Sequence, residues 1–224
     1  MPDAREQQTT DAAKRRLSVT VFSDYICPFC YVGDARLDTL RDLYDLDVDW
    51  CFFEIHPDNP AEGKPVEELG YPPEQWKRMM ENLEQMAAHD GLPLAPRTFT
   101  TNSHSALLLA QATRSLAPER FERLHKRLFE AYFSEQLNIG DRNVLRTIAE
   151  ECGISAHIVE QAWGEPMFEQ QLRDQFWRAA QIGVQGVPAF LFGRYIVSGA
   201  VPAETLARAA QHVLNETPGE EADP

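Results

Sequence analysis

The sequence has no long apolar run and no surplus of basic residues. No stretch approaches the roughly eighteen apolar residues of a membrane span, and residues 1–16 are polar, without the apolar segment of a secretory signal. The 35 acidic residues outnumber the 21 lysines and arginines, which gives a formal net charge of −14. Such a charge disfavours nucleic acids and anionic membranes as partners. We therefore expect a cytoplasmic protein that binds neither.

Cysteine is also scarce. The 224 residues contain four cysteines and a single Cys-x-x-Cys motif, formed by Cys27 and Cys30. Because structural disulfides are rare in the cytoplasm, this motif indicates either a redox pair or a metal site. Zinc is the alternative, since Cys51 and His56 follow, but on one continuous strand these two side chains point to opposite faces. We favour the redox pair and predict no metal and no other cofactor.

The residues around the motif predict a junction between a strand and a helix. Residues 17–22 are rich in β-branched side chains, and leucines recur at helical spacing over residues 34–43. Pro28 then stands at the first helical position, which suits its fixed φ. The sulfur of Cys27 faces the free N–H groups of the helix start, which favour thiolate over thiol. Cys30, one turn on, is placed to attack a mixed disulfide at Cys27.

The rest of the chain predicts an α/β order. Residues 46–55 are apolar on both alternating faces, as in a covered parallel strand. From residue 66 to residue 182 the signals are helical. Residues 189–198 predict a hairpin around Gly193, and residues 206–213 carry the apolar face of a last helix. The expected order is strand, helix, strand, helical insertion, hairpin, helix.

Several residues predict where the inserted helices begin and end. Pro118 and Pro166 suit first helical positions, and Asp141 and Ser155 suit N-caps. Gly183 suits the end of the last inserted helix.

This order, together with the Cys27 motif and Val187-Pro188, resembles the DsbA-like family, a thioredoxin fold that carries a helical insertion. Within that family the sequence is most similar to the FrnE branch, which itself resembles 2-hydroxychromene-2-carboxylate isomerase and kappa-class glutathione transferases. Phe29 differs from the tryptophan usual in that branch. Cys27 differs from the serine typical of the isomerase and transferase branches. The stretches that carry the resemblance are residues 24–33, 101–104, 128–133 and 183–190.

The resemblance also implies a division of the chain. A thioredoxin-like domain is expected from residues 17–65 and 183–215. Residues 66–182 are expected to form the inserted helical subdomain. A flexible N-terminal tail (1–16) and an acidic C-terminal tail (216–224) complete the chain.

The resemblance implies a thiol–disulfide oxidoreductase in which Cys27 attacks and Cys30 resolves. Pro28 and Phe29 are expected to contact the substrate. The implied partners are protein or small-molecule thiols and disulfides, and the chain is expected to be a monomer or a homodimer. One alternative is a glutathione-dependent isomerase or transferase that uses the same cleft. Another is a holdase-like module that binds unfolded segments through the methionine-rich stretch at 76–86.

Pro188 is implied to be a cis-proline facing the Cys27 motif. The backbone of Val187 is then able to pair with an extended substrate near Cys27. The alternative is a trans-proline that starts a strand.

Asn102 and His104 open an inserted helix that the resemblance places near the cleft. Asn102 is expected to offer its amide to the substrate or to glutathione, and His104 to supply a proton to a leaving thiolate. The alternative is capping of the helix by Thr101 or Asn102, with His104 as a surface residue. Cys51 and Cys152 are interpreted as buried structural thiols.

Overall fold

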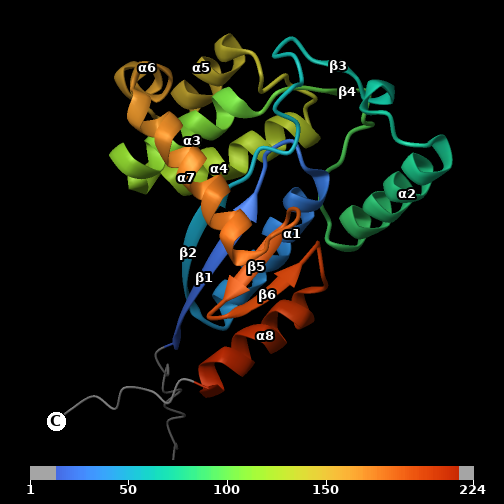
Figure 1. The fold of residues 1–224 in the computed structure, drawn as a ribbon, viewed down its shortest axis with the longest axis vertical. Coiled ribbons are helices and arrows are strands. Elements are labelled where there is room, and N and C mark those ends of the chain that lie inside the picture. Colours follow the sequence, from blue (N-terminus) through green and yellow to red (C-terminus); the bar gives the residue numbers. More distant parts are fainter. Residues whose placement is uncertain (1–13, 217–224) are drawn as a thin grey trace, which may run out of the picture.

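A four-stranded mixed sheet lies at the centre of the computed structural model, which describes residues 14–216 (Figure 1). The strand order is β2-β1-β5-β6, with β1 parallel to β2 and β5 antiparallel to both of its neighbours. The strands are β1 (Arg16–Ser23), β2 (Asp45–Phe52), β5 (Ala189–Phe192) and β6 (Tyr195–Ser198).

Helices cover both faces of this sheet. Helix α1 (Pro28–Asp38) and helix α8 (Ala203–Glu216) pack on one face, and α7 (Pro166–Ile182) packs against β2 on the other. The side chains of β1 divide accordingly: Val21 belongs to the large core that includes α1, whereas Phe22 belongs to a small cluster with Ala179 of α7.

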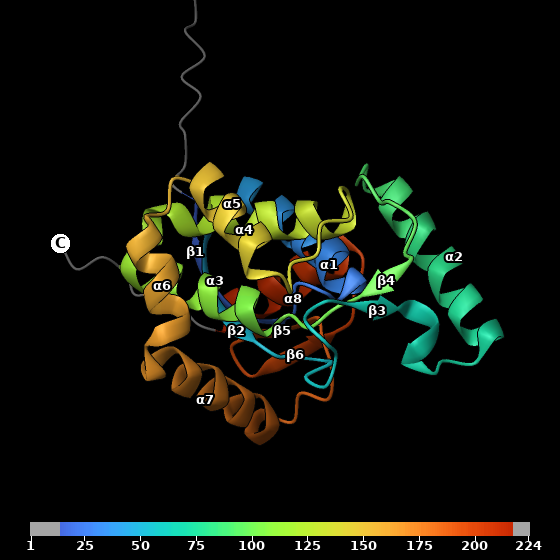
Figure 2. The same cartoon turned by 90° about the horizontal axis from the view of Figure 1, so that it is seen from above.

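The chain between β2 and β5 is mainly helical, as expected. Helices α3 to α6 gather at one end of the sheet, α7 runs from them over one face of it, and α2 stands apart on the other side of the molecule (Figures 1 and 2). The insertion contains α2 (Pro73–His89), α3 (His104–Leu116), α4 (Pro118–Phe133), α5 (Arg142–Glu151), α6 (Ala156–Gly164) and α7. Among residues 14–216 the 3₁₀ segments are η1 (Thr39–Asp42) and η2 (Val66–Leu69).

The predicted α/β order is confirmed, and so are most of the predicted helix boundaries. Pro118 and Pro166 occupy the first turns of α4 and α7. The side chains of Asp141 and Ser155 accept hydrogen bonds from backbone N–H groups at the starts of α5 and α6. Gly183 ends α7 with φ of 86°, a left-handed conformation that glycine adopts without strain.

Two details differ from the sequence-based expectation. The insertion contains a short strand, β4 (Phe99–Thr100), which pairs with β3 (Lys64–Pro65); two residues are too few for an alternating pattern. The second strand of the sheet ends at Phe52, not at residue 55. Beyond it the N–H of Ile55 donates to the Asp24 carboxylate at 2.8 Å instead of continuing the ladder.

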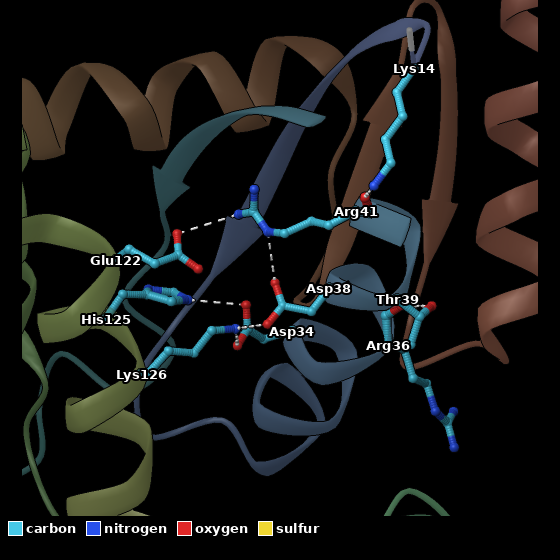
Figure 3. Close-up of polar contacts among 9 residues, drawn as sticks. All are labelled: Lys14, Asp34, Arg36, Asp38, Thr39, Arg41, Glu122, His125 and Lys126. Carbon is cyan, nitrogen blue, oxygen red and sulfur yellow. Dashed lines mark hydrogen bonds and ion pairs between the residues drawn. The ribbon is translucent and has the colours of Figure 1, made fainter. Parts of the chain in front are cut away.

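The insertion is joined to α1 by a buried polar network (Figure 3). His125 Nε2 donates to Asp34 Oδ1 at 3.1 Å, and Lys126 Nζ donates to Asp34 Oδ2 at 2.6 Å. His125 Nδ1 also shares a hydrogen bond of 2.9 Å with the hydroxyl of Tyr25, two residues before Cys27. Burial opposes ionisation of Asp34, but His125 and Lys126 outweigh it, so the pKa of Asp34 is lowered. The network therefore connects α4 to the segment that leads into the Cys-x-x-Cys motif.

Among residues 14–216, no helix combines the length and the apolar character needed to cross a membrane. The predicted flexible and acidic tails lie largely outside the described residues, because residues 1–13 and 217–224 are not part of them. Their expected properties and the expected division into two domains stay predictions.

Candidate redox site

Cys27 and Cys30 lie at the start of α1, as their spacing predicts. Cys27 is the N-cap with extended backbone (φ −84°, ψ 113°), and Pro28 opens the helix. The N–H of Cys30 donates to the Cys27 carbonyl at 3.0 Å. Both thiols are free. The two cysteines therefore lie together at the start of one helix.

The environment of Cys30 favours its protonated form. Cys30 is 1% exposed, and burial, followed by the neighbouring Cys27, raises the pKa of Cys30 well above its ordinary value. The N–H of Asp24 and the hydroxyl of Ser23 act in the opposite direction but do not cancel the effect. Cys27, at 5% exposed, lines a cleft, whereas Cys30 lies behind it. The two cysteines are therefore suited to different steps of an exchange reaction.

The segment before β5 reaches the sulfur of Cys27. The Val187–Pro188 peptide bond is cis, as the resemblance implies. The thiol of Cys27 donates to the carbonyl of Val187 at 3.6 Å. On the other side of Pro188 lies Gly33 of α1, where an added Cβ would be 3.1 Å from Pro188 Cγ. The fold thus brings together Cys27, Val187 and Pro188, which are about 160 residues apart in the chain.

A cleft of about 380 Å³ opens beside Cys27. Pro28 and Phe29 line it from α1, and Val187 lines it from the segment before β5. Trp76, Met79 and Met80 of α2 form the opposite side, so part of the methionine-rich stretch contributes to the cleft. The cleft is large enough for a small molecule or a short peptide segment.

Sequence reasoning assigned no role to Asp24 or Arg97, which both lie at this site. Asp24 is 1% exposed, and burial raises its pKa to about 7, although the N–H groups of Ile55 and Ile26 donate to it. Its position three residues before Cys27 is the sequence feature that could have marked Asp24 as a site residue. Arg97 lines the cleft from the loop between α2 and β4, and no local pattern marks it.

Asn102 and His104 are not among the residues that line the Cys27 cleft. The amide of Asn102 donates to the carbonyl of Pro57 at 2.9 Å and to Glu54 at 3.1 Å, and its oxygen accepts from the N–H of His104 at 2.8 Å. The N-cap of α3 is Ser103, with no side-chain capping hydrogen bond, so neither the substrate-binding role nor the capping alternative is settled for Asn102.

The ring of His104 lies between two carboxylates. Its nitrogens are 3.1 Å from Glu54 and 2.7 Å from Glu169. The hydrogen bond that His104 donates to Glu54, followed by that to Glu169, outweighs burial and raises the pKa of His104 to about 9. His104 lines a separate cavity of about 260 Å³.

The remaining cysteines are buried away from the cleft. The thiol of Cys51 donates to the carbonyl of Gln175 at 3.4 Å, and burial raises its pKa to about 12. Cys51 lies in the small cluster on the α7 face of the sheet, whereas Cys27 lies in the main core. Burial also raises the pKa of Cys152. Within residues 14–216, no three His, Cys, Asp or Glu side chains gather as a metal site would need.

Comparison with known proteins adds a family context. A family model described as DSBA-like thioredoxin domain matches residues 18–211. YwbO, an uncharacterised protein from Bacillus subtilis (strain 168), is 26% identical over 192 residues, which cover 85% of this chain and 94% of YwbO.

Two solved structures illustrate the range of similar folds. A probable DsbA oxidoreductase from Streptomyces coelicolor has a TM-score of 0.80 at 28% identity and covers 92% of this chain and 94% of its own. A 2-hydroxychromene-2-carboxylate isomerase has a TM-score of 0.71 at 18% identity and covers 89% of this chain and 97% of its own.

Proposed function

The chain belongs to the DSBA-like thioredoxin domain family, and we propose that it is a thiol–disulfide oxidoreductase that exchanges disulfides through Cys27 and Cys30. One observation carries the proposal: Cys27 is the N-cap of α1 and lines a cleft, while Cys30 is buried behind it with a raised pKa. The position of Cys27 at the helix start gives it access to the cleft, and burial keeps Cys30 a thiol until it is needed.

In the proposed cycle the Cys27 thiolate attacks one sulfur of a substrate disulfide. The substrate S–S bond breaks, one substrate thiolate leaves and takes up a proton, and a mixed disulfide forms at Cys27. Cys30 then loses its proton and attacks the Cys27 sulfur, which releases the second substrate thiolate. Two electrons pass from the cysteine pair to the substrate, and the pair becomes a disulfide. In reverse, the oxidised pair introduces a disulfide into a substrate dithiol.

The segment before β5 supports substrate docking at the same place. Within residues 14–216 the N–H of Val187 has no hydrogen-bond acceptor, and Val187 lines the cleft next to Cys27. An extended substrate backbone is able to use this N–H. The proposed substrates are protein or small-molecule disulfides. The FrnE branch, the cytoplasmic location and the monomeric or homodimeric state remain predictions.

The alternative is a glutathione-dependent isomerase in the same cleft. The presence of both cysteines favours the oxidoreductase, because an exchange reaction needs a resolving thiol whereas a glutathione-assisted isomerisation does not. Isomerisation of 2-hydroxychromene-2-carboxylate with glutathione that persists in Cys27→Ser would favour the alternative.

Reduction of insulin by dithiothreitol tests the proposal. We expect Cys27→Ser to abolish the catalysed rate and Cys30→Ser to accumulate a mixed disulfide that non-reducing electrophoresis detects. Cys152→Ala is the matched control, because Cys152 is buried in the helical insertion outside the cleft. Turnover of Cys27→Ser at the wild-type rate would refute the oxidoreductase.

A further inference from the structure

The imidazole of His125 lies between the two segments that flank the Cys-x-x-Cys motif. Nδ1 shares a hydrogen bond of 2.9 Å with the hydroxyl of Tyr25, two residues before Cys27. Nε2 donates to Asp34 Oδ1 at 3.1 Å, and Asp34 stands one helical turn after Cys30 (Figure 3). One side chain of the helical insertion therefore holds the chain on both sides of the redox pair.

Tyr25 belongs to a turn that ends at the first cysteine. The N–H of Cys27 donates to the carbonyl of Asp24 at 3.1 Å, which closes a turn with Tyr25 and Ile26 at its centre. The N–H of Ile26 also donates to the Asp24 carboxylate at 3.2 Å. Because the turn is tight, fixing the Tyr25 side chain also fixes the backbone that carries Cys27.

The ring of His125 is itself held in place by aromatic neighbours. The residue is 1% exposed, and its ring centroid lies 4.0 Å from that of Trp50, 5.1 Å from that of Phe129 and 5.6 Å from that of Phe121. The ring of Phe129 also lies 5.0 Å from that of Tyr25. In a close-packed core the imidazole has no room to rotate away from its two hydrogen-bond partners. It is therefore a rigid connection between the two flanks.

Stability alone does not account for this connection. Asp34 and His125 are buried, and apolar side chains of similar volume often stabilise a core as well as a buried ionic contact does. Hydrogen bonds add what apolar packing lacks, because they are directional and favour one orientation of the groups that they join. A reaction between two side chains needs such orientation, since Cys30 has to approach the sulfur of Cys27 from a defined direction.

We propose that His125 is a positioning residue that speeds the second step of the proposed exchange reaction. In that step Cys30 loses its proton and attacks the Cys27 sulfur, the bond between Cys27 and the substrate breaks, and the substrate thiolate leaves and takes up a proton. The first step needs only an accessible Cys27. The second depends on the relative position of both cysteines, which the contacts with Tyr25 and Asp34 fix. The inference rests on the proposed function, because it assigns a residue to one step of that reaction.

Two substitutions break the same hydrogen bond from opposite sides. Tyr25→Phe removes the hydroxyl and keeps the aromatic ring. His125→Gln places an amide near the former Nε2, so the bond to Asp34 is able to persist while the bond to Tyr25 is lost. Because both variants lose the same contact, we expect the double variant to be no slower than either single variant.

Single-turnover kinetics separate the two steps. Reduced protein is mixed with 2-hydroxyethyl disulfide and quenched with acid, and mass spectrometry quantifies the mixed disulfide and the Cys27–Cys30 disulfide. In the Cys30→Ser background, where only the first step occurs, we expect both single variants to react within about twofold of the unsubstituted background. With Cys30 present, we expect them to resolve the mixed disulfide roughly fivefold more slowly, the ratio that one lost hydrogen bond typically produces.

Asp38→Asn is the matched control. Asp38 accepts hydrogen bonds from Lys126 and from Arg41 in the same network (Figure 3), but it lies about two turns after Cys30, at the end of α1. We expect this variant to resolve the mixed disulfide at the wild-type rate. Thermal unfolding verifies that each variant is folded, and Tyr25→Phe carries the test if His125→Gln is not.

Three outcomes would overturn the inference and leave the proposed function intact: unchanged resolution in Tyr25→Phe, equal slowing in Asp38→Asn, or equal slowing of both steps. A double variant whose loss is the product of the two single losses would also contradict a shared contact. If wild type forms the mixed disulfide but never the Cys27–Cys30 disulfide, the proposed function fails, and the inference fails with it.

Discussion

At the scale of single residues, Asp24 and His104 have pKa values raised for different reasons. Asp24 is raised by burial, which disfavours its charged form. His104 is raised by hydrogen bonds to Glu54 and Glu169, which favour its charged form. Both shifts make the folded state less stable as the pH rises, but in different pH ranges.

For Asp24 this pH range lies between its ordinary pKa of 3.8 and its pKa of about 7 in the folded chain. There the folded chain keeps a proton that the unfolded chain has lost, so the free energy of unfolding decreases as the pH rises and levels off above about 7. Asp24→Asn cannot ionise. We expect this variant to be more stable than wild type at pH 8 by about 2 kcal/mol, after allowance for the one hydrogen bond that the amide nitrogen of asparagine cannot accept.

Urea unfolding of wild type and Asp24→Asn at pH 5 and pH 8 checks this expectation. The difference in the free energy of unfolding between the two proteins should grow from pH 5 to pH 8. The comparison isolates Asp24, because the contributions of all other titratable groups are the same in both proteins. An unchanged difference would mean that Asp24 is already ionised at pH 5.

For His104 the folded pKa of about 9 exceeds the ordinary value of 6.5. Its stabilising effect is therefore complete below about pH 6.5 and is lost as the pH rises through about 9. The side chain is 35% exposed, so solvent screens both ion pairs. We expect His104→Gln to lower the free energy of unfolding by about 1 kcal/mol at pH 6 and by almost nothing at pH 10. An NMR titration in which His104 has a pKa near 6.5 would contradict this.

At the scale of secondary-structure elements, the position of α1 depends on a close approach at Gly33. An added Cβ would meet Phe190 Cζ and Pro188 Cγ, both at 3.1 Å, and these atoms are buried. A methyl group there has to push α1 away from the segment that contacts Cys27.

We therefore expect Gly33→Ala to lower the free energy of unfolding by about 2 kcal/mol, although alanine favours helices. Gly164→Ala in α6 is the matched control, since nothing lies within 4 Å of its added Cβ, and it should be neutral or slightly stabilising. Chemical denaturation measures both variants. Equal effects would show that packing at Gly33 does not limit the position of α1.

At the scale of the whole molecule, the sheet region and the helical insertion are joined by buried polar contacts. Asp34 of α1 binds His125 and Lys126 of α4 (Figure 3), and Arg36 of α1 binds Asp90 at the end of α2 at 2.6 Å. Because the pKa of Asp34 is lowered, its stabilising effect is present above pH 4 and is lost as the pH falls below that value.

We expect Asp34→Asn to lower the free energy of unfolding at pH 7 by roughly 3 kcal/mol, because the ion-pair partners lose their counter-charge in a buried site. Asp47→Asn is the control. Asp47 pairs with Arg16 at 2.8 Å with both side chains more than half exposed, so its loss should cost less than about 0.5 kcal/mol. Similar losses in the two variants, measured by urea unfolding, would argue against a joining role for Asp34.

The sequence by itself determined the local geometry of the redox motif. Pro28 cannot donate an N–H and has a fixed φ, so it marks the start of α1 and places Cys27 at the helix end. Asp141, Ser155 and Gly183 likewise mark helix ends, because capping depends on residues one to three positions away. The family motif was also sufficient to indicate that Val187 and Pro188 meet Cys27.

Only the tertiary structure decided what surrounds that motif. Arg97 reaches the cleft from a loop about 70 residues away, and no periodicity or capping pattern records such an approach. Asn102 and His104 belong to a stretch that resembles the family. In the structure, however, Asn102 bonds to Pro57 and Glu54, and His104 bonds to Glu169, outside the cleft. The physical reason is that backbone preferences act over a few neighbouring residues, whereas burial and charge depend on segments that only packing brings together.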